Sequence, residues 1–195
     1  MSEEFRQTSV LIVSSGNNAI DYFTQLLPPD RFSPIETATN AGEAERLTVD
    51  RTYGLVIINT PLTDDFGTRL AVNLVRYETT GILLLVKSNL YDQILYKTEP
   101  YGIVTLSKPV DKHTALQTIN ALVSMRNRIQ AFEVKVESLE NRMKEIKIVN
   151  RAKLILVEQL KMSESEAHRF IEKSAMDRCV KRKEIAENII KTYEN

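Results

Sequence analysis

The sequence predicts an α/β domain with a five-stranded parallel sheet, followed by a long coiled-coil helix and a C-terminal three-helix unit. Two observations lead to this fold class. In the first half, short apolar runs alternate with helical patterns, which is the rhythm of a doubly wound sheet. In the second half, apolar residues recur at alternating spacings of three and four, as they do at the a and d positions of heptads. We expect domains at residues 1–120, 121–149 and 150–195.

The predicted strands are short apolar runs that lie between helical patterns. Most are apolar almost throughout, which suits parallel strands covered on both faces. The second run is weaker, and its Pro34 is compatible with the edge of a sheet. We expect strands at residues 9–13, 32–38, 54–58, 81–86 and 102–106, and helices at 19–27, 41–49, 66–78 and about 90–98.

The heptad pattern predicts a dimerisation helix. Neither Gly nor Pro occurs after Pro109, so the last helix that covers the sheet can continue directly into this rod. One alternative is a single amphipathic helix packed on its own chain. A strict repeat of this length favours a partner helix instead, and therefore a homodimer. The predicted dimer seam consists of Leu122, Met125, Ile129, Phe132, Val136, Leu139, Met143 and Ile146.

The tail predicts two further helices that pack on the end of the rod. Ser163 and Glu166 have the spacing of a capping box, which marks the start of the first. The second follows the basic cluster at residues 181–183 and has an apolar side formed by Ile185, Ala186, Ile189, Ile190 and Tyr193. The predicted buried positions of the first are Ala167, Phe170, Ile171, Ser174, Ala175 and Met176.

Composition favours a cytoplasmic protein. The single cysteine, Cys179, excludes an internal disulfide framework, and no apolar run approaches the roughly 20 residues of a membrane helix. The polar, acidic N-terminus lacks the apolar core of a signal peptide. The 26 basic and 26 acidic residues balance, but residues 126–195 hold 16 basic against 12 acidic ones, which suggests an anionic partner.

Over residues 8–120, the order of elements and the motif SKPVD at 107–111 resemble the receiver domain of two-component response regulators, a flavodoxin-like fold. The resemblance implies acidic residues after the first strand, a phosphoacceptor Asp after the third, a hydroxyl after the fourth and a Lys after the fifth. This chain keeps only the last of these. The predicted degenerate pocket consists of Ser14, Ser15, Asn59, Val86 and Lys108.

We expect this pocket to bind no Mg²⁺ and to accept no phosphoryl group. Magnesium requires hard oxygen ligands, usually including carboxylates, and an amide cannot form the acyl phosphate. The expected role of Asn59 is to satisfy hydrogen bonds of the loop, with Lys108 as a candidate partner. Asp64 and Asp65 follow Asn59 by five and six positions and are poor substitutes, and Thr105 stands at the aromatic switch position. The domain is thus predicted to be a pseudo-receiver that serves as a binding platform.

From about residue 140 onward, the tail resembles an ANTAR domain, the RNA-binding output module of bacterial antitermination regulators. The match rests on Ala152-Lys153 with Leu156, on SESEAHRFI at 163–171, on Ser174-Ala175-Met176 and on the apolar pairs at 185–186 and 189–190. Leu154 stands where the family often has Gly.

The resemblance implies that the protein binds structured nascent RNA and stabilises an antiterminator. Tyr193 is a candidate for stacking on a base, and several of the basic side chains are alternatively explained as solvated helix faces or as partners of a helix dipole. The candidate RNA contacts are Arg151, Lys153, His168, Arg169, Lys173, Arg178, Lys181, Arg182 and Lys183.

The predicted function is therefore a dimeric, RNA-binding antitermination regulator controlled by protein contacts. A ligand-sensing regulatory protein or a histidine kinase is the expected partner, and no cofactor is expected. One alternative is a DNA-binding helix-turn-helix regulator, and another is a signalling scaffold that binds no nucleic acid. We do not expect an enzyme, because the sequence has no Gly-rich phosphate loop or metal-ligand cluster, and neither His113 nor His168 stands near a plausible nucleophile.

Overall fold

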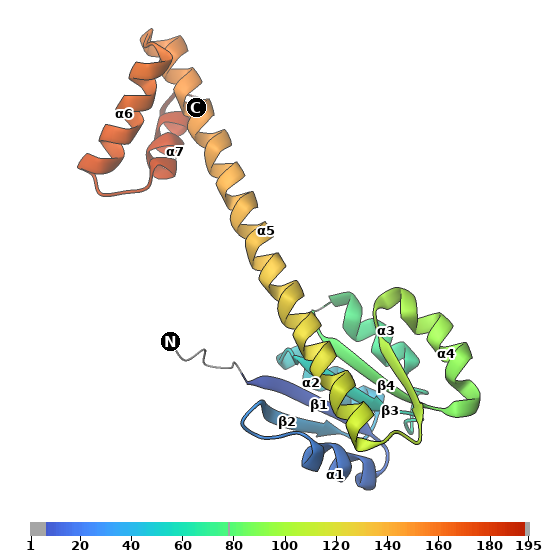
Figure 1. Ribbon diagram of the computed structural model, residues 1–195. Coiled ribbons are helices and arrows are strands. Elements are labelled where there is room, and N and C mark those ends of the chain that lie inside the picture. The colour runs from blue at the N-terminus through green and yellow to red at the C-terminus, as the bar shows by residue number, and fades with distance from the viewer. Residues whose placement is uncertain (1–6, 78, 194–195) are drawn as a thin grey trace. The chain divides into compact units, whose positions relative to one another are not determined.

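The computed structural model describes residues 7–77 and 79–193 and divides the chain into two compact units, Met1–Ala131 and Phe132–Asn195 (Figure 1). Residues 1–6, 78, 194 and 195 fall within predicted domains or helices but lie outside the described residues. None of the described helices combines the length and the apolar character that crossing a membrane requires.

The first unit contains a five-stranded sheet in the order β2-β1-β3-β4-β5, in which every neighbouring pair is parallel. The prediction of a parallel sheet with residues 32–38 at an edge is confirmed. Gly102 adopts a left-handed conformation (φ 71°) that ends a short 3₁₀ helix, and for this reason the last strand begins later than predicted. The strands are β1 (Thr8–Ser14), β2 (Phe32–Ala38), β3 (Leu55–Asn59), β4 (Gly81–Lys87) and β5 (Val104–Lys108).

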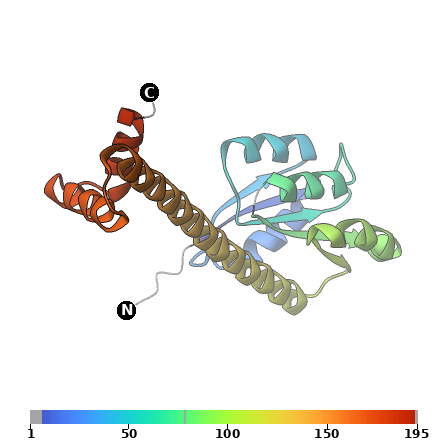
Figure 2. The same cartoon turned by 90° about the horizontal axis from the view of Figure 1, so that it is seen from above.

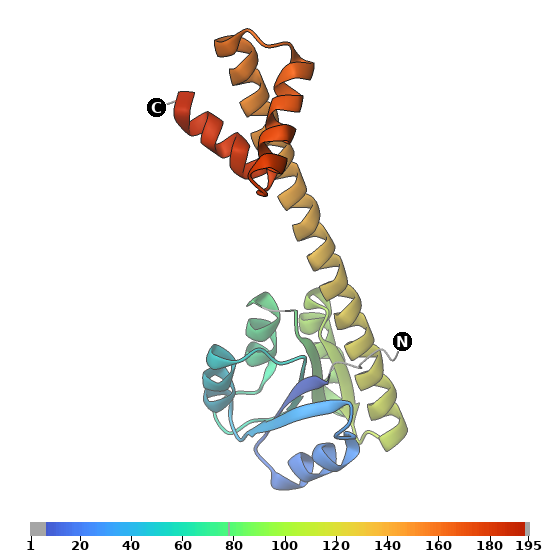
Figure 3. The same cartoon turned by 90° about the vertical axis from the view of Figure 1, so that its left-hand side faces the viewer.

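Helices cover both faces of the sheet, and each face has its own core (Figures 1 and 3). Leu11, Val56 and Leu84 point to the face covered by α2, α3 and α4, whereas Ile12 and Leu83 point to the face covered by α1 and α5. This alternation follows from the period of two along each strand. The helices are α1 (Asn17–Leu26), α2 (Ala41–Asp50), α3 (Thr68–Tyr77), α4 (Tyr91–Thr98) and α5 (Lys112–Leu160), with 3₁₀ helices η1 (Ser88–Leu90) and η2 (Glu99–Tyr101).

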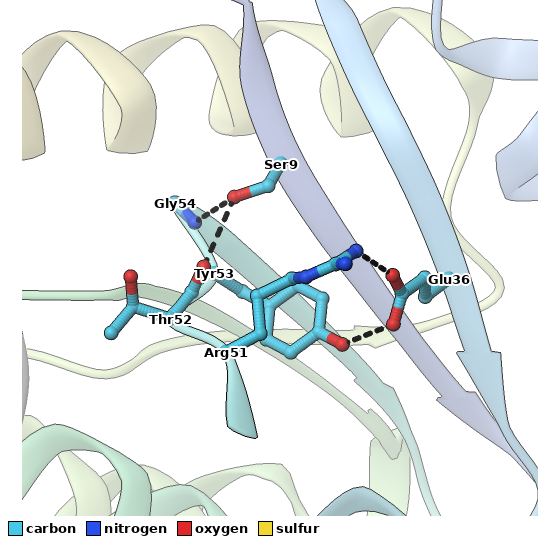
Figure 4. A network of polar contacts seen from close by, with 6 residues as sticks. All are labelled: Ser9, Glu36, Arg51, Thr52, Tyr53 and Gly54. Atoms are coloured by element: carbon cyan, nitrogen blue, oxygen red, sulfur yellow. Dashed lines mark hydrogen bonds and ion pairs between the residues drawn. The ribbon is translucent and has the colours of Figure 1, made fainter. Parts of the chain in front are cut away.

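A polar network links the segment before β3 to strands β1 and β2 (Figure 4). The Glu36 carboxylate on β2 accepts hydrogen bonds from the Tyr53 hydroxyl and from the Arg51 guanidinium. The Ser9 hydroxyl on β1 accepts from the amide of Gly54, at 3.1 Å. Burial and the bond to Glu36 raise the pKa of Tyr53 to about 12, so the phenol remains a donor at neutral pH.

Helix α5 is continuous over 49 residues, as the absence of Gly and Pro predicts. Its first turns bury Ala115 and Ile119 against the sheet, and its last turns bury Ala152 and Leu156 in the core of the second unit. That unit is completed by α6 (Glu164–Asp177) and α7 (Arg182–Tyr193), which gather around the C-terminal end of α5 (Figures 1 and 2).

The predicted capping box at the start of α6 is confirmed. The Ser163 hydroxyl accepts from the Glu166 amide, and the Glu166 carboxylate accepts from the Ser163 amide at 2.8 Å. Two predicted core positions are wrong, because Phe170 is 44% exposed and Met176 is 77% exposed. The two packed helices cover only the stripe of α6 that repeats every fourth residue, namely Ala167, Ile171 and Ala175.

Candidate nucleic-acid interface and strand-end pocket

Three of the predicted pocket residues meet at the carboxyl ends of β1, β3 and β5. The Asn59 amide donates to the Ser14 hydroxyl at 3.0 Å, and Lys108 Nζ donates to Asn59 Oδ1 at 2.9 Å. Lys108 Nζ also donates to the backbone carbonyl of Thr60. The predicted bond between Asn59 and Lys108 is therefore confirmed, and the ammonium group is satisfied by neutral oxygens.

The charge of Lys108 has no carboxylate among these bonded partners. Partial burial, and secondarily the repulsion from Lys87, lower the pKa of Lys108 below its ordinary value. Lys87 is paired with Lys108 in the register of β4 and β5, so two cations end adjacent strands. A Mg²⁺ ion does not fit here, because the ammonium group occupies the Asn59 oxygen and the Ser14 hydroxyl is the remaining side-chain oxygen of the cluster.

The structure does not bring the other predicted pocket residues into this cluster. Ser15 is exposed and donates to the carbonyl of Pro61 at 3.1 Å. Val86 is fully buried in the core beneath α2, α3 and α4, and Thr105 shares a hydrogen bond with Thr98 at 2.9 Å. Sequence analysis missed Ser88, whose hydroxyl donates to the Lys108 carbonyl at 2.6 Å. A search two residues beyond Val86 would have found it.

The two loop carboxylates have structural partners of their own. Asp64 accepts from the amides of Ala41 and Gly42, at 2.8 and 2.9 Å, and so caps α2 from a distant loop. These two hydrogen bonds lower the pKa of Asp64. Asp65 accepts from the Gly67 amide at 2.6 Å and forms an ion pair with Arg69 at 3.2 Å. Within the described parts of the chain, neither carboxylate contacts Lys108.

The predicted RNA contacts lie on the second unit, and they divide by whether acidic side chains neutralise them. Lys153 pairs with Glu164 at 3.0 Å, and Lys183 pairs with Glu187 at 3.6 Å. Glu172 lies between His168 and Arg182, at 3.3 and 3.4 Å. Arg151 is exposed on α5. The predicted contacts that are exposed and have no acidic partner among residues 7–77 and 79–193 are Arg169, Lys173, Arg178 and Lys181.

Some of these unpaired cations border two hollows on the surface of the second unit. Arg169 and Lys173 line a hollow of about 420 Å³, and Arg178 lines another of about 210 Å³. Lys181 follows α6 and precedes the start of α7, next to the paired side chains of Arg182 and Lys183. The structure therefore separates the predicted basic cluster at 181–183 from the cations that border the hollows.

The seam residues remain exposed in the single chain, with one exception. Leu122 is 5% exposed, because it packs with Ile119 and Val123 in the core between α5 and the sheet. Met125 and Ile129 border an apolar groove of about 290 Å³ on the first unit. The other seam residues, Phe132, Val136, Leu139, Met143 and Ile146, are each about half exposed on α5.

Comparison with known proteins identifies the second unit. Residues 137–190 match the family model of the ANTAR domain. The transcriptional regulatory protein PdtaR of Mycobacterium tuberculosis is 26% identical over 168 residues, which cover 86% of this chain and 82% of that protein. The aliphatic amidase regulator of Pseudomonas aeruginosa is 28% identical over 107 residues, which cover 55% of this chain and 49% of that protein.

Solved structures support the fold of the first unit. The signal receiver domain of an HD domain-containing protein from Pseudomonas fluorescens Pf-5 has a TM-score of 0.60 and 24% identity, over 67% of this chain and 97% of that domain. A two-component response regulator from Clostridium difficile has a TM-score of 0.55 and 23% identity, over 60% of this chain and 97% of that one. The first unit thus has a receiver-like fold.

The Asp64 cap predicts a specific pH dependence of stability. Because folding lowers the pKa of Asp64, the carboxylate stabilises the native state above its unfolded pKa of about 3.9, and this contribution is lost as the pH falls through the folded pKa. We expect Asp64→Asn to lower the urea midpoint at pH 7 and to weaken the loss of stability below about pH 4. Asp30→Asn, at an exposed carboxylate, serves as the control. Equal pH profiles for both variants would contradict the capping role.

Proposed function

We propose that this chain, which carries an ANTAR domain behind a receiver-like fold, is an RNA-binding antitermination regulator that stabilises an antiterminator stem-loop in nascent mRNA. The ANTAR match over residues 137–190 is the observation that carries this proposal. The relatives are named as regulators rather than enzymes, which is consistent with it. Among the described residues there is also no group of three or more His, Cys, Asp or Glu side chains placed to hold a metal ion.

The architecture of the second unit favours looped RNA over duplex DNA. A helix-turn-helix protein reads duplex DNA with the exposed face of one helix in the major groove. In α7, Ile185, Ala186 and Ile189 are committed to the three-helix core, and the exposed cation Lys183 pairs with Glu187 on the same helix. The unpaired cations belong to α6 and its C-terminal end instead, beside hollows that can accept unstacked bases.

The first test is a gel shift with the leader RNA upstream of the neighbouring operon, with duplex DNA of the same sequence as competitor. We expect a complex that resists the DNA and that weakens about tenfold or more in Lys181→Glu/Arg182→Glu, because reversed charges repel phosphates. The matched control, Arg46→Glu/Lys97→Glu, reverses two exposed cations of the first unit. Preference for DNA would favour a DNA-binding regulator, and an equal loss in both variants would show a mere dependence on net charge.

We further propose that α5 forms a coiled-coil homodimer. From Phe132 to Ile146 the seam residues are half exposed at heptad spacing, and burying each would remove apolar surface from water. Val134 is also exposed but lies on the opposite side of the heptad, at the f position when Val136 is assigned to a. The two valines therefore offer a matched pair on one helix.

We expect Val136→Asp to convert the dimer to a monomer and Val134→Asp to leave it intact. Burying the exposed half of a valine is worth about 1 kcal/mol, and a symmetric dimer loses two such contributions, so the dissociation constant should rise at least about thirtyfold, with the desolvation of two carboxylates adding to this. Light scattering at micromolar concentration measures the mass, and circular dichroism verifies the helical content of each variant. A dimer that survives Val136→Asp, or one that fails equally in both variants, would contradict the predicted seam.

We propose that the receiver-like domain acts through protein contacts rather than through Asp phosphorylation. Asn59 accepts a hydrogen bond from Lys108, and no carboxylate among the described residues bonds to Lys108, which supports a pocket without a phosphoacceptor. A ligand-sensing regulatory protein or a histidine kinase is the proposed kind of partner. The domain would then present its surface as a platform and use no chemistry at the pocket.

Acetyl phosphate with Mg²⁺ should therefore leave the intact mass of the protein unchanged. Asn59→Asp restores a carboxylate beside Lys108 but still lacks the acidic pair, since Ser14 and Ser15 stand in its place. We expect this variant to remain unmodified as well, for want of a metal site. Intact-mass spectrometry measures both proteins, with an active receiver protein as the positive control. A stoichiometric adduct of one phosphoryl group on the natural chain would overturn the proposal.

A further inference from the structure

An aromatic side chain is partly exposed on the surface of α6. Phe170 is 44% exposed and lines both hollows of the second unit. Leu160, the last residue of α5, lines both as well and is 45% exposed. Tyr193 lines the smaller hollow from the end of α7. Two aromatic rings and one aliphatic side chain thus line one hollow, Phe170 from the middle of α6, Leu160 from the end of α5 and Tyr193 from the end of α7.

The rims of these hollows are positively charged. Lys161, Arg169 and Lys173 border the larger hollow, and Arg178 borders the smaller one. All four are exposed, and no described acidic side chain pairs with any of them. The single carboxylate at the larger hollow belongs to Glu166, which is held by the amide and hydroxyl of Ser163 in the capping box.

The backbone between α5 and α6 contributes one of these cations from an unusual conformation. Lys161 has a φ of 57°, in the left-handed region that glycine occupies most easily. This turn ends α5 at Leu160 and leads into Met162, which also lines the larger hollow. A lysine therefore occupies a backbone conformation in which glycine would be less strained, and its charged side chain lies at the rim of the larger hollow.

We propose that Phe170 is a stacking platform for one unpaired base of the RNA loop. Lys161, Arg169 and Lys173 then hold the phosphates on either side of that base, and Tyr193 with Arg178 receives a neighbouring nucleotide. The inference rests on the proposed RNA-binding function and names its point of contact. Stacking on aromatic rings and contacts between cations and phosphates are two of the interactions by which proteins hold unstacked bases.

The chemistry of the surface favours this occupant over others. The bases of duplex DNA are stacked and paired inside the helix, so they do not reach an aromatic ring in a hollow. An apolar helix from a second protein would fill the hollows but would leave four cations without counter-charges. A looped nucleic acid supplies both a flat π-surface and the negative charge.

The absence of tryptophan from the chain permits a direct measurement. Phe170→Trp introduces a single indole at the proposed platform, and Met176→Trp introduces one elsewhere on α6, at a position that is 77% exposed and lines neither hollow. The probe is a pool of RNA hairpins with randomised loops, enriched on the natural chain. We expect RNA to quench the emission of the first variant strongly and to leave the second nearly unchanged.

The affinity of the same hairpins supplies a second readout. Phe170→Leu keeps an apolar side chain but removes the ring, and we expect RNA binding to weaken about tenfold or more. Phe170→Tyr keeps the ring and should bind within about twofold of the natural protein. Met176→Leu is the control for a change at an exposed position of the same helix, and thermal melts followed by circular dichroism verify the fold of each variant.

The outcomes distinguish this inference from the proposed function. Quenching at position 170 together with loss of affinity in Phe170→Leu supports the platform. Hairpin binding that is unaffected by Phe170→Leu, with no quenching at position 170, overturns the platform and leaves RNA binding intact. Failure to enrich any hairpin overturns RNA binding and the platform with it. A change of oligomeric mass in Phe170→Leu, measured by light scattering without RNA, would assign the hollows to a protein contact and would also overturn the platform.

Discussion

The continuous helix α5 is the constraint on which the rest of the molecule depends. Its first turns complete one core of the sheet through Ala115 and Ile119, and its last turns complete the three-helix core through Ala152 and Leu156. Neither unit can bury its apolar surface without its share of this helix. The seam residues from Phe132 to Ile146 belong to neither core and stay about half exposed in the single chain. This part of α5 keeps the heptad pattern although it belongs to neither core, which is why we propose that it packs on a second copy of the chain.

The strand-end pocket illustrates how an amide in place of a carboxylate changes a site without unfolding it. A carboxylate beside Lys108 would favour the charged ammonium and raise its pKa. With Asn59 there, partial burial and the neighbouring Lys87 act unopposed, and the pKa of Lys108 falls. The side-chain amide of Asn59 nevertheless has its hydrogen-bond partners, because it accepts from Lys108 and donates to Ser14. An amide offers both a donor and an acceptor, so Asn59 can accept from the ammonium and donate to the hydroxyl oxygen, whereas an ionised carboxylate can only accept.

The elements that local patterns encode were predictable, and those that depend on contacts between helices were not. The strands, the capping box of Ser163 and Glu166 and the unbroken helix α5 all follow from residues near one another in sequence. The exposure of Phe170 did not follow, because periodicity identifies the apolar side of a helix but not how much of that side its neighbours cover. Arg182 pairs with Glu172 across the turn between α6 and α7, so no helical spacing on either helix reveals that its charge is partly neutralised. Leu122 has the spacing of a seam residue, but its side chain is buried in the core of the first unit.

The net charge of the C-terminal residues understates the positive charge of the proposed RNA interface. Residues 150–195 hold 10 basic and 8 acidic side chains, a modest excess for a protein that binds nucleic acid. Several of those acids are bound to cations of the same unit, and four cations without an acidic partner among the described residues, Lys161, Arg169, Lys173 and Arg178, line the hollows around Phe170 and Leu160. One such interface is small, so its affinity for a single loop is expected to be limited. A dimer presents two, and the second contact forms at the high effective concentration that a shared RNA provides. Under the proposed function, a partner that covers the α5 seam would prevent dimerisation. It would thus weaken RNA binding without contacting a base or a phosphate, so RNA binding would be regulated through dimerisation.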